Sequence, residues 1–176
     1  AIPSGYPMAG KNNWIRIILA EDRPIFRDAL KALLLRRSGI IIIGETGNWN
    51  EIQKMASEHQ PDILILNPGT LRTTDPELLK SFRKLHNRLK IIVLIDSMHH
   101  DETARYFQEG ANAVVSKDSP STILFSCIKA VMTGKYWIGN KAVSRPNEKL
   151  RKPQNQSKLA DSSRYGLTPR EKMSSS

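Results

Sequence analysis

The residues that can form a binding site directly follow short apolar runs of the sequence. Glu21 and Asp22 follow WIRIILA, Asn67 follows DILIL, and Lys117 follows AVVS. Carboxylates, an amide and an ammonium group bind ligands through charge and hydrogen bonds. Nothing in the sequence resembles a Ser-His-Asp arrangement, a P-loop or a Cys-x-x-Cys pair. We therefore expect a binding protein and not an enzyme.

The elements that must hold these residues alternate between strand and helix patterns. Five short apolar runs, rich in β-branched residues, are typical of buried strands: 14–20, 40–44, 62–66, 90–95 and 113–116. Helical spacing of apolar residues follows each of them, within 24–38, 50–59, 77–85, 101–109 and 120–132. Polar residues just before the helices at Pro24, Pro76 and Pro120 are the expected N-caps: Asp22, Asp75 and Ser119.

This alternation predicts an α/β fold with a doubly wound, five-stranded parallel sheet in the order 2-1-3-4-5. Ligands bind such sheets beyond the carboxyl ends of the strands, at the switch point between strands one and three. The rule selects the residues that follow strands one, three, four and five: Glu21, Asp22, Asn67, Ile95, Asp96, Ser97 and Lys117.

Composition narrows the class of protein further. The chain has 176 residues, of which 39% are hydrophobic, enough for an ordinary buried core. Its apolar runs are far shorter than the roughly 20 residues of a membrane span, so we expect no membrane association. A single cysteine, Cys127, excludes an intrachain disulfide, and its apolar neighbours place it in the core. A reducing, cytoplasmic setting is the simplest one.

Four stretches together resemble the receiver domains of two-component response regulators, in the NarL/FixJ (LuxR-type) branch. They are IRIILAEDRPIFRDALKALL, PDILILN, EGANAVVSKDSP and LTPRE. The resemblance covers about residues 15–140 and a fragment at 167–171, and its elements occur in the family's order. It implies a flavodoxin-like (CheY-like) receiver fold.

The resemblance also implies a role for each candidate residue. In the family, an acidic pair after the first strand holds Mg²⁺, which corresponds to Glu21 and Asp22 here. A lysine after the fifth strand pairs with the phosphoryl group, which corresponds to Lys117. The position of the phosphorylated aspartate is taken by Asn67, and that of the Thr/Ser switch residue by Ile95.

These last two departures predict a degenerate phosphoacceptor site. An amide is a poor nucleophile without charge, and isoleucine cannot hydrogen-bond a phosphoryl oxygen. Asn67 alone could be an engineered change, but the two departures together favour natural degeneration. Asn67 cannot deamidate to Asp through attack by the next backbone nitrogen, because that nitrogen belongs to Pro68 and carries no hydrogen. We expect a permanently unphosphorylated pocket that requires no cofactor and binds Mg²⁺ weakly.

The vacated pocket leaves two alternatives open. It can bind a small ligand, or it can hold an internal ion pair between Lys117 and an acidic residue, which is the simpler outcome. Asp96 or Ser97 can lean into the pocket as partial substitutes for the lost groups, and Arg23 and Arg72 can lie close to it. His99 and His100 lack an obvious third metal ligand and read as loop residues at the start of the fourth helix.

The chain divides into four expected parts. Residues 1–13 read as a disordered leader or tag, 14–140 as the receiver domain, 141–164 as a basic linker, and 165–176 as the start of a truncated LuxR-type helix-turn-helix. Residues 135–176 hold ten Lys/Arg against three Asp/Glu, which is +7 of the chain's net +10. Such a tail fits equally a surface for nucleic acid and a solubilising linker.

We therefore expect an atypical (pseudo-)receiver of a LuxR-family DNA-binding transcriptional regulator. It would act without aspartyl phosphorylation, through homodimerisation or through binding of a protein partner or a small ligand. DNA contact would come only from a helix-turn-helix that this chain lacks, whether by truncation or by natural loss. The alternative is a stand-alone adaptor or ligand-binding signalling module with no DNA-binding role.

Overall fold

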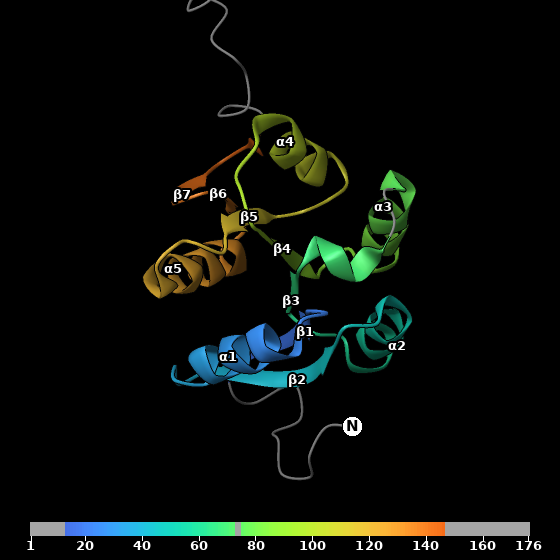
Figure 1. Cartoon of the computed structure of the whole chain (residues 1–176), viewed down its shortest axis with the longest axis vertical. Helices are drawn as coiled ribbons and strands as arrows, with labels where there is room; N and C mark the ends of the chain where they lie inside the picture. The colour runs from blue at the N-terminus through green and yellow to red at the C-terminus, as the bar shows by residue number, and fades with distance from the viewer. Residues whose placement is uncertain (1–12, 73–74, 147–176) are drawn as a thin grey trace, which may run out of the picture. The chain divides into compact units, whose positions relative to one another are not determined.

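The computed structural model describes residues 13–72 and 75–146, which form one sheet with helices on both of its faces (Figure 1). The strands are β1 Ile15–Ala20, β2 Ile40–Thr46, β3 Ile63–Leu66, β4 Lys90–Ile95, β5 Ala113–Ser116, β6 Tyr136–Ile138 and β7 Lys141–Val143. The helices are α1 Pro24–Leu34, α2 Trp49–His59, the 3₁₀ turn η1 Pro68–Leu71, α3 Pro76–Leu85, α4 His100–Gln108 and α5 Ser121–Met132.

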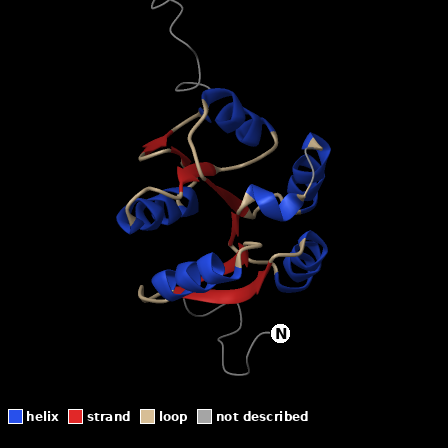
Figure 2. Cartoon of the chain, in the orientation of Figure 1, coloured by secondary structure: helices blue, strands red, loops and turns tan. Residues whose placement is uncertain are grey.

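The strand order is β2-β1-β3-β4-β5-β6-β7. Its first five strands are parallel and run in the order 2-1-3-4-5, so the predicted doubly wound fold is confirmed. Figure 2 shows the layering, with α1 and α5 on one face of the strands and α2, α3 and α4 on the other.

Alternating strand residues build two separate cores. Ile17 and Leu19 of β1 face α1 and α5, where they pack with buried residues such as Leu124. Ile18 and Ala20 of the same strand face α2, α3 and α4. Because successive strand residues point to opposite faces, a strand buried on both faces must be apolar throughout. That requirement explains the apolar run over residues 17–20, the buried part of β1.

The sheet is larger than the five strands predicted from the sequence. β6 pairs in parallel with β5, and β7 pairs antiparallel with β6, with Trp137 opposite Ala113 on one side and Ala142 on the other. The predicted receiver boundary at residue 140 falls inside this hairpin, and the predicted linker begins at the first residue of β7. Strands of three residues are too short for a periodicity to show.

The predicted helix caps have different outcomes. Asp75 accepts a hydrogen bond from the Glu77 amide at 2.9 Å, so this cap is confirmed. Asp22 does not cap α1, whose N-cap is Arg23, because its carboxylate accepts a hydrogen bond from Asn67 instead. The N-cap of α5 is Pro120 and not Ser119. The fifth helix thus starts one residue later than predicted.

Two further expectations concern the helices. Cys127 of α5 is fully buried, as predicted. His99 and His100 stand at the start of α4, also as predicted. Over 13–72 and 75–146, every helix is too short or too polar for a membrane crossing. The expected leader (1–13) except its last residue, most of the linker and the helix-turn-helix fragment (165–176) lie outside the described residues.

Candidate functional site

The sheet topology brings the predicted site residues together at one edge. Glu21 follows β1, Asn67 follows β3, Asp96 follows β4 and Lys117 follows β5, and these four strands are neighbours. A pocket of about 530 Å³ opens there, and its walls include Asp22, Arg23, Asn67, Ile95, Asp96 and Ser97. The carboxyl edge of a parallel sheet is where this class of fold binds ligands.

Asn67 is the centre of the pocket. Its side-chain Nδ2 donates to Glu21 Oε1 at 2.8 Å and to Asp22 Oδ1 at 3.0 Å. Its Oδ1 accepts from the Gly69 amide at 3.3 Å. With the amide turned the other way, its oxygen would face two carboxylates and its nitrogen another N–H, so the hydrogen bonds fix this orientation. Asn67 thus joins the two acidic side chains from a buried position.

Glu21 is the most buried acidic residue of the site, with 2% of its surface exposed. Its Oε1 also accepts from the backbone amide of Arg23 at 2.8 Å, and the Arg23 guanidinium lies 3.4 Å away. Its Oε2 has no hydrogen-bond partner among the described residues. The hydrogen bonds and the ion pair that stabilise the buried Glu21 carboxylate therefore all reach its Oε1 atom.

Lys117 forms an ion pair with Asp96, with Nζ 3.2 Å from Oδ1. Arg23 approaches the same oxygen at 3.6 Å. The hydrogen bond and charge of Lys117, with a smaller effect of Arg23, lower the pKa of the Asp96 carboxyl below its ordinary value. Both cations also lie 5.3 Å from the centre of the Phe26 ring. An ion pair of Lys117 with an acidic residue was one of the two alternatives inferred from the sequence.

The two ends of this ion pair differ strongly in exposure. The side chain of Lys117 is 8% exposed, whereas that of Asp96 is 77% exposed. Ile95, which precedes Asp96, is buried and contributes an apolar side chain to the pocket wall. Ser97 also lies on the wall. Asp96 therefore reaches from solvent toward a buried cation.

The residues that the family uses for Mg²⁺ are present but are not arranged for it. Mg²⁺ takes oxygen ligands in near-octahedral geometry, and here Asn67 directs an N–H group at both carboxylates. Over residues 13–72 and 75–146, no group of three or more His, Cys, Asp or Glu is placed to hold a metal ion. As arranged, the acidic pair fits a hydrogen-bond donor better than a metal.

Glu102 on the pocket wall and its hydrogen-bond partner Tyr106 were not predicted from the sequence. Glu102 of α4 lies on the wall of the Asn67 pocket, and its Oε1 accepts from the hydroxyl of Tyr106 at 3.1 Å. Burial, followed by the charge of Glu102, raises the pKa of Tyr106 to about 12. The i,i+4 spacing of Glu102 and Tyr106 was the available signal. Arg72 lies on the wall of a neighbouring pocket, beside Thr46 and Asn48, and this pocket shares Asp22 with the Asn67 pocket.

Comparison with protein families gives a match to the response regulator receiver domain over residues 17–129. Among curated proteins, the Bacillus subtilis transcriptional regulatory protein LiaR is 26% identical over 137 residues, which are 78% of this chain and 65% of LiaR. BvgA of Bordetella pertussis is 27% identical over 119 residues, which are 68% of this chain and 56% of BvgA. The chain thus spans less than two thirds of the length of these relatives.

Solved structures agree with the family match. A LuxR-family two-component response regulator from Aurantimonas sp. SI85-9A1 superposes with a TM-score of 0.64 at 25% identity, covering 70% of this chain and 89% of that one. A LuxR-family DNA-binding response regulator from Staphylococcus aureus gives a TM-score of 0.58 at 26% identity, covering 66% and 98%. The similarity extends over nearly the whole of both neighbours.

Proposed function

This chain belongs to the response regulator receiver domain family, and from that premise we propose that it is a receiver working without aspartyl phosphorylation. Receivers of this family are signalling modules, and its neighbours include LuxR-type response regulators. We assign the chain to a LuxR-type transcriptional regulator of the cytoplasm. Nothing in this role requires an enzymatic activity of the chain itself.

One observation carries the proposal, the double hydrogen bond from Asn67 Nδ2 to Glu21 and Asp22. Formation of an acyl phosphate requires an ionised carboxylate that attacks phosphorus. Asn67 offers an amide instead, and both of its N–H groups are already engaged. Because the acidic pair accepts these hydrogen bonds from an amide, the proposed role requires no cofactor, and we expect weak Mg²⁺ binding.

Without phosphoryl transfer, the output of this receiver depends on association. We propose a homodimer, or binding to a protein partner or small ligand, as the event that transmits its state. DNA contact would belong to a helix-turn-helix outside the described residues. RcsB from Salmonella, a structural neighbour, has been solved bound to promoter rprA. That structure describes DNA binding by RcsB, and it is a precedent for the DNA contact that we propose.

A second candidate function is a stand-alone adaptor or ligand-binding signalling module without a DNA-binding role. The buried Lys117, held by an exposed carboxylate, favours a site that accepts a ligand. The sequence of the gene beyond Ser176 separates the two functions. A complete helix-turn-helix there supports the transcriptional regulator, and a stop codon supports the adaptor.

The proposal is tested by intact mass after incubation with acetyl phosphate and Mg²⁺, alongside Mg²⁺ titrations of the natural chain and Asn67→Asp. We expect no phosphoryl adduct on the natural chain and tighter Mg²⁺ binding by Asn67→Asp, which regains a third carboxylate. Asn67→Ala is the matched control, because it removes the amide without adding a charge. A phosphoryl adduct on the natural chain would refute the proposal.

A further inference from the structure

A second, mostly apolar cavity lies between α1 and α5, and Lys117 forms part of its wall. Its volume is about 210 Å³. Its floor consists of buried side chains from both helices and from the central strands, Leu30, Leu94, Val115 and Leu124. The half-buried Phe26 and Leu33 of α1 form part of the wall. We call this cavity the α1–α5 slot.

Lys117 gives the slot a charged residue. Its side chain is only 8% exposed and contributes to the wall of the slot. A buried cation requires a counter-charge, because it has lost most of its hydration. Its partner among the described acidic residues, Asp96, is 77% exposed and is shared with Arg23. Ion pairs of such exposed side chains contribute little, so a carboxylate in a drier position can compete with this one.

We propose that the α1–α5 slot binds a small aromatic carboxylate, with its ring on the apolar floor and its carboxylate on Lys117 in place of Asp96. A cavity of about 150 Å³ lined by Leu, Ile and Phe is known to hold benzene. The 210 Å³ of the slot therefore accommodates one ring and a carboxylate group. Phe26 adds a partner for edge-to-face packing with that ring.

The dimensions of the slot favour a small ligand over a second copy of the chain. A stable protein interface buries roughly 800 Å² on each partner, whereas the slot is a narrow recess. A single buried cation at the wall matches one carboxylate group. The rim carries the exposed Ala29 and Ser121, which leave the entrance open to solvent.

Occupation of the slot would alter the Asn67 pocket. Once a ligand carboxylate takes Lys117, Asp96 loses its main partner, and Asp96 and Arg23 become free to rearrange at the pocket wall. The ligand would thus supply an input to a receiver that does not use phosphorylation. This inference goes beyond the proposed function, and it stands or falls separately because it requires Lys117 and the slot but not Asn67.

The test is calorimetric titration of the full chain with sodium benzoate, and with benzamide as the uncharged counterpart. We expect saturable one-to-one binding of benzoate and at least about tenfold weaker binding of benzamide, since a hydrogen bond to a charged group is lost. Lys117→Gln should weaken the binding of benzoate by the same factor. Asp96→Asn should strengthen it about two- to fivefold by removing the competitor. Lys129→Gln, an exposed cation elsewhere on α5, should leave the affinity unchanged.

A second variant keeps the test informative if Lys117→Gln folds poorly. Ala29→Phe adds a ring at the exposed rim of the slot without touching Lys117, and it should abolish benzoate binding. Equal affinities in the natural chain and Ala29→Phe would overturn the proposal, as would the absence of saturable benzoate binding. A dimeric sedimentation mass, with benzoate affinity that weakens as the protein concentration rises, would overturn it by assigning the slot to a second copy. Benzoate binding is measured on the slot and Lys117, whereas the proposed function is tested by the phosphoryl adduct on the natural chain, so failure of one can be told from failure of the other.

Discussion

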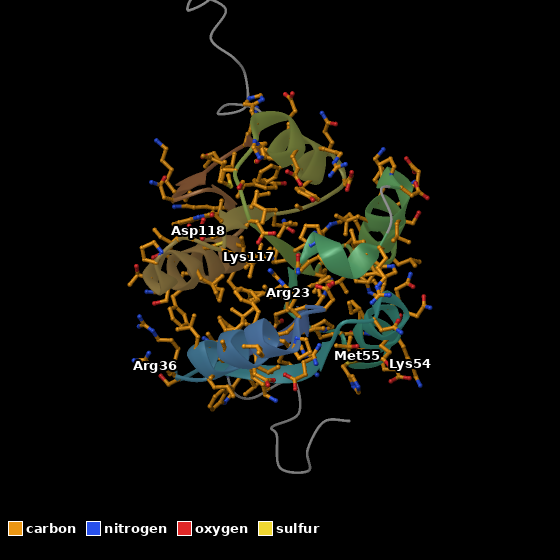
Figure 3. The ribbon with its side chains drawn as sticks, in the orientation of Figure 1. Arg23, Arg36, Lys54, Met55, Lys117 and Asp118 are labelled. Carbon is orange, nitrogen blue, oxygen red and sulfur yellow. The ribbon has the colours of Figure 1, made fainter. Side chains whose placement is uncertain are left out.

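The two sides of the carboxyl edge solve the problem of buried charge in opposite ways. On the β1–β3 side, Asn67 donates to both Glu21 and Asp22 from within the fold. On the β5 side, Lys117 depends on Asp96, which stands mostly in solvent and is shared with Arg23. Figure 3 labels Arg23 near the start of α1 and Lys117 near the start of α5. We call the first arrangement, which is held by a buried amide, the closed side, and the second, which is held by an exposed carboxylate, the open side.

This difference separates what the receiver has lost from what it has kept. In the proposed function, the hydrogen bonds from Asn67 to Glu21 and Asp22 replace the charge and metal chemistry of the family on the closed side. The open side retains a buried cation whose partner can be replaced by another anion. A regulator built this way can respond to a ligand at Lys117 through Asp96 and Arg23, while Asn67 keeps its hydrogen bonds to Glu21 and Asp22.

The largest effect is expected from breaking the closed side with Asn67→Asp. The change removes two hydrogen bonds to charged groups and adds a third carboxylate beside Glu21 and Asp22. We expect the free energy of unfolding without Mg²⁺ to fall by about 2 to 4 kcal/mol. Urea denaturation with and without Mg²⁺ measures it, and Mg²⁺ should restore part of the loss. Asn67→Ala should lose less and show no Mg²⁺ response, and equal stabilities of all three chains would contradict the closed arrangement.

A smaller effect should follow from Tyr106→Phe, which tests how α4 supports the wall of the Asn67 pocket. Loss of the hydroxyl bond to Glu102 should lower the free energy of unfolding by about 1 kcal/mol at neutral pH. Folding raises the pKa of Tyr106 to about 12. The contribution of Tyr106 to the free energy of unfolding is therefore complete below pH 10 and is lost as the pH rises toward 12. Denaturation curves of both chains across this range provide the measurement. Between pH 10 and 12, the free energy of unfolding should fall more for the natural chain than for the variant. An equal fall in both chains would show that folding does not raise the pKa of Tyr106.

The smallest effect is expected on the open side and is seen in a titration. Lys117→Gln should raise the pKa of Asp96 toward its ordinary 3.8, and Arg23→Gln should raise it less. NMR titration of the Asp96 carboxyl measures both. Because this pKa is depressed in the folded state, Asp96 contributes to the stability of the fold above pH 3.8, and this contribution is lost on acidification below that pH. A larger rise from Arg23→Gln would mean that Arg23, and not Lys117, holds Asp96.

Much of the fold follows from the sequence because the strands β1 to β5 are apolar, have at least four residues each and are evenly spaced along the chain. The same patterns could not reveal β6 and β7, which have three residues each. The assignment of Asp22 as a helix cap was wrong because a sequence does not show that Asn67 competes for that carboxylate. Asp75 was assigned correctly because its carboxylate reaches an amide in the first turn of its own helix, which is a local contact.

The candidate site shows the same division between local and tertiary information. Strand ends selected Asn67, Asp96 and Lys117 in advance, because their positions depend on topology alone. The pairing of Lys117 with Asp96 depends on how two loops meet. The α1–α5 slot depends on side chains from two helices far apart in the sequence, and no local pattern predicts such a cavity.

The β6–β7 hairpin has a consequence for the behaviour of the chain in concentrated solution. Without the hairpin, β5 would be an exposed edge strand, and the unpaired backbone groups of such strands can pair with strands of other molecules. Trp137 and Ile138 occupy that edge, and the new outermost strand, β7, is short and carries the exposed Lys141. A strand of this length and charge is a poor template for aggregation. The hairpin therefore protects the β5 edge of the sheet from pairing with strands of other molecules.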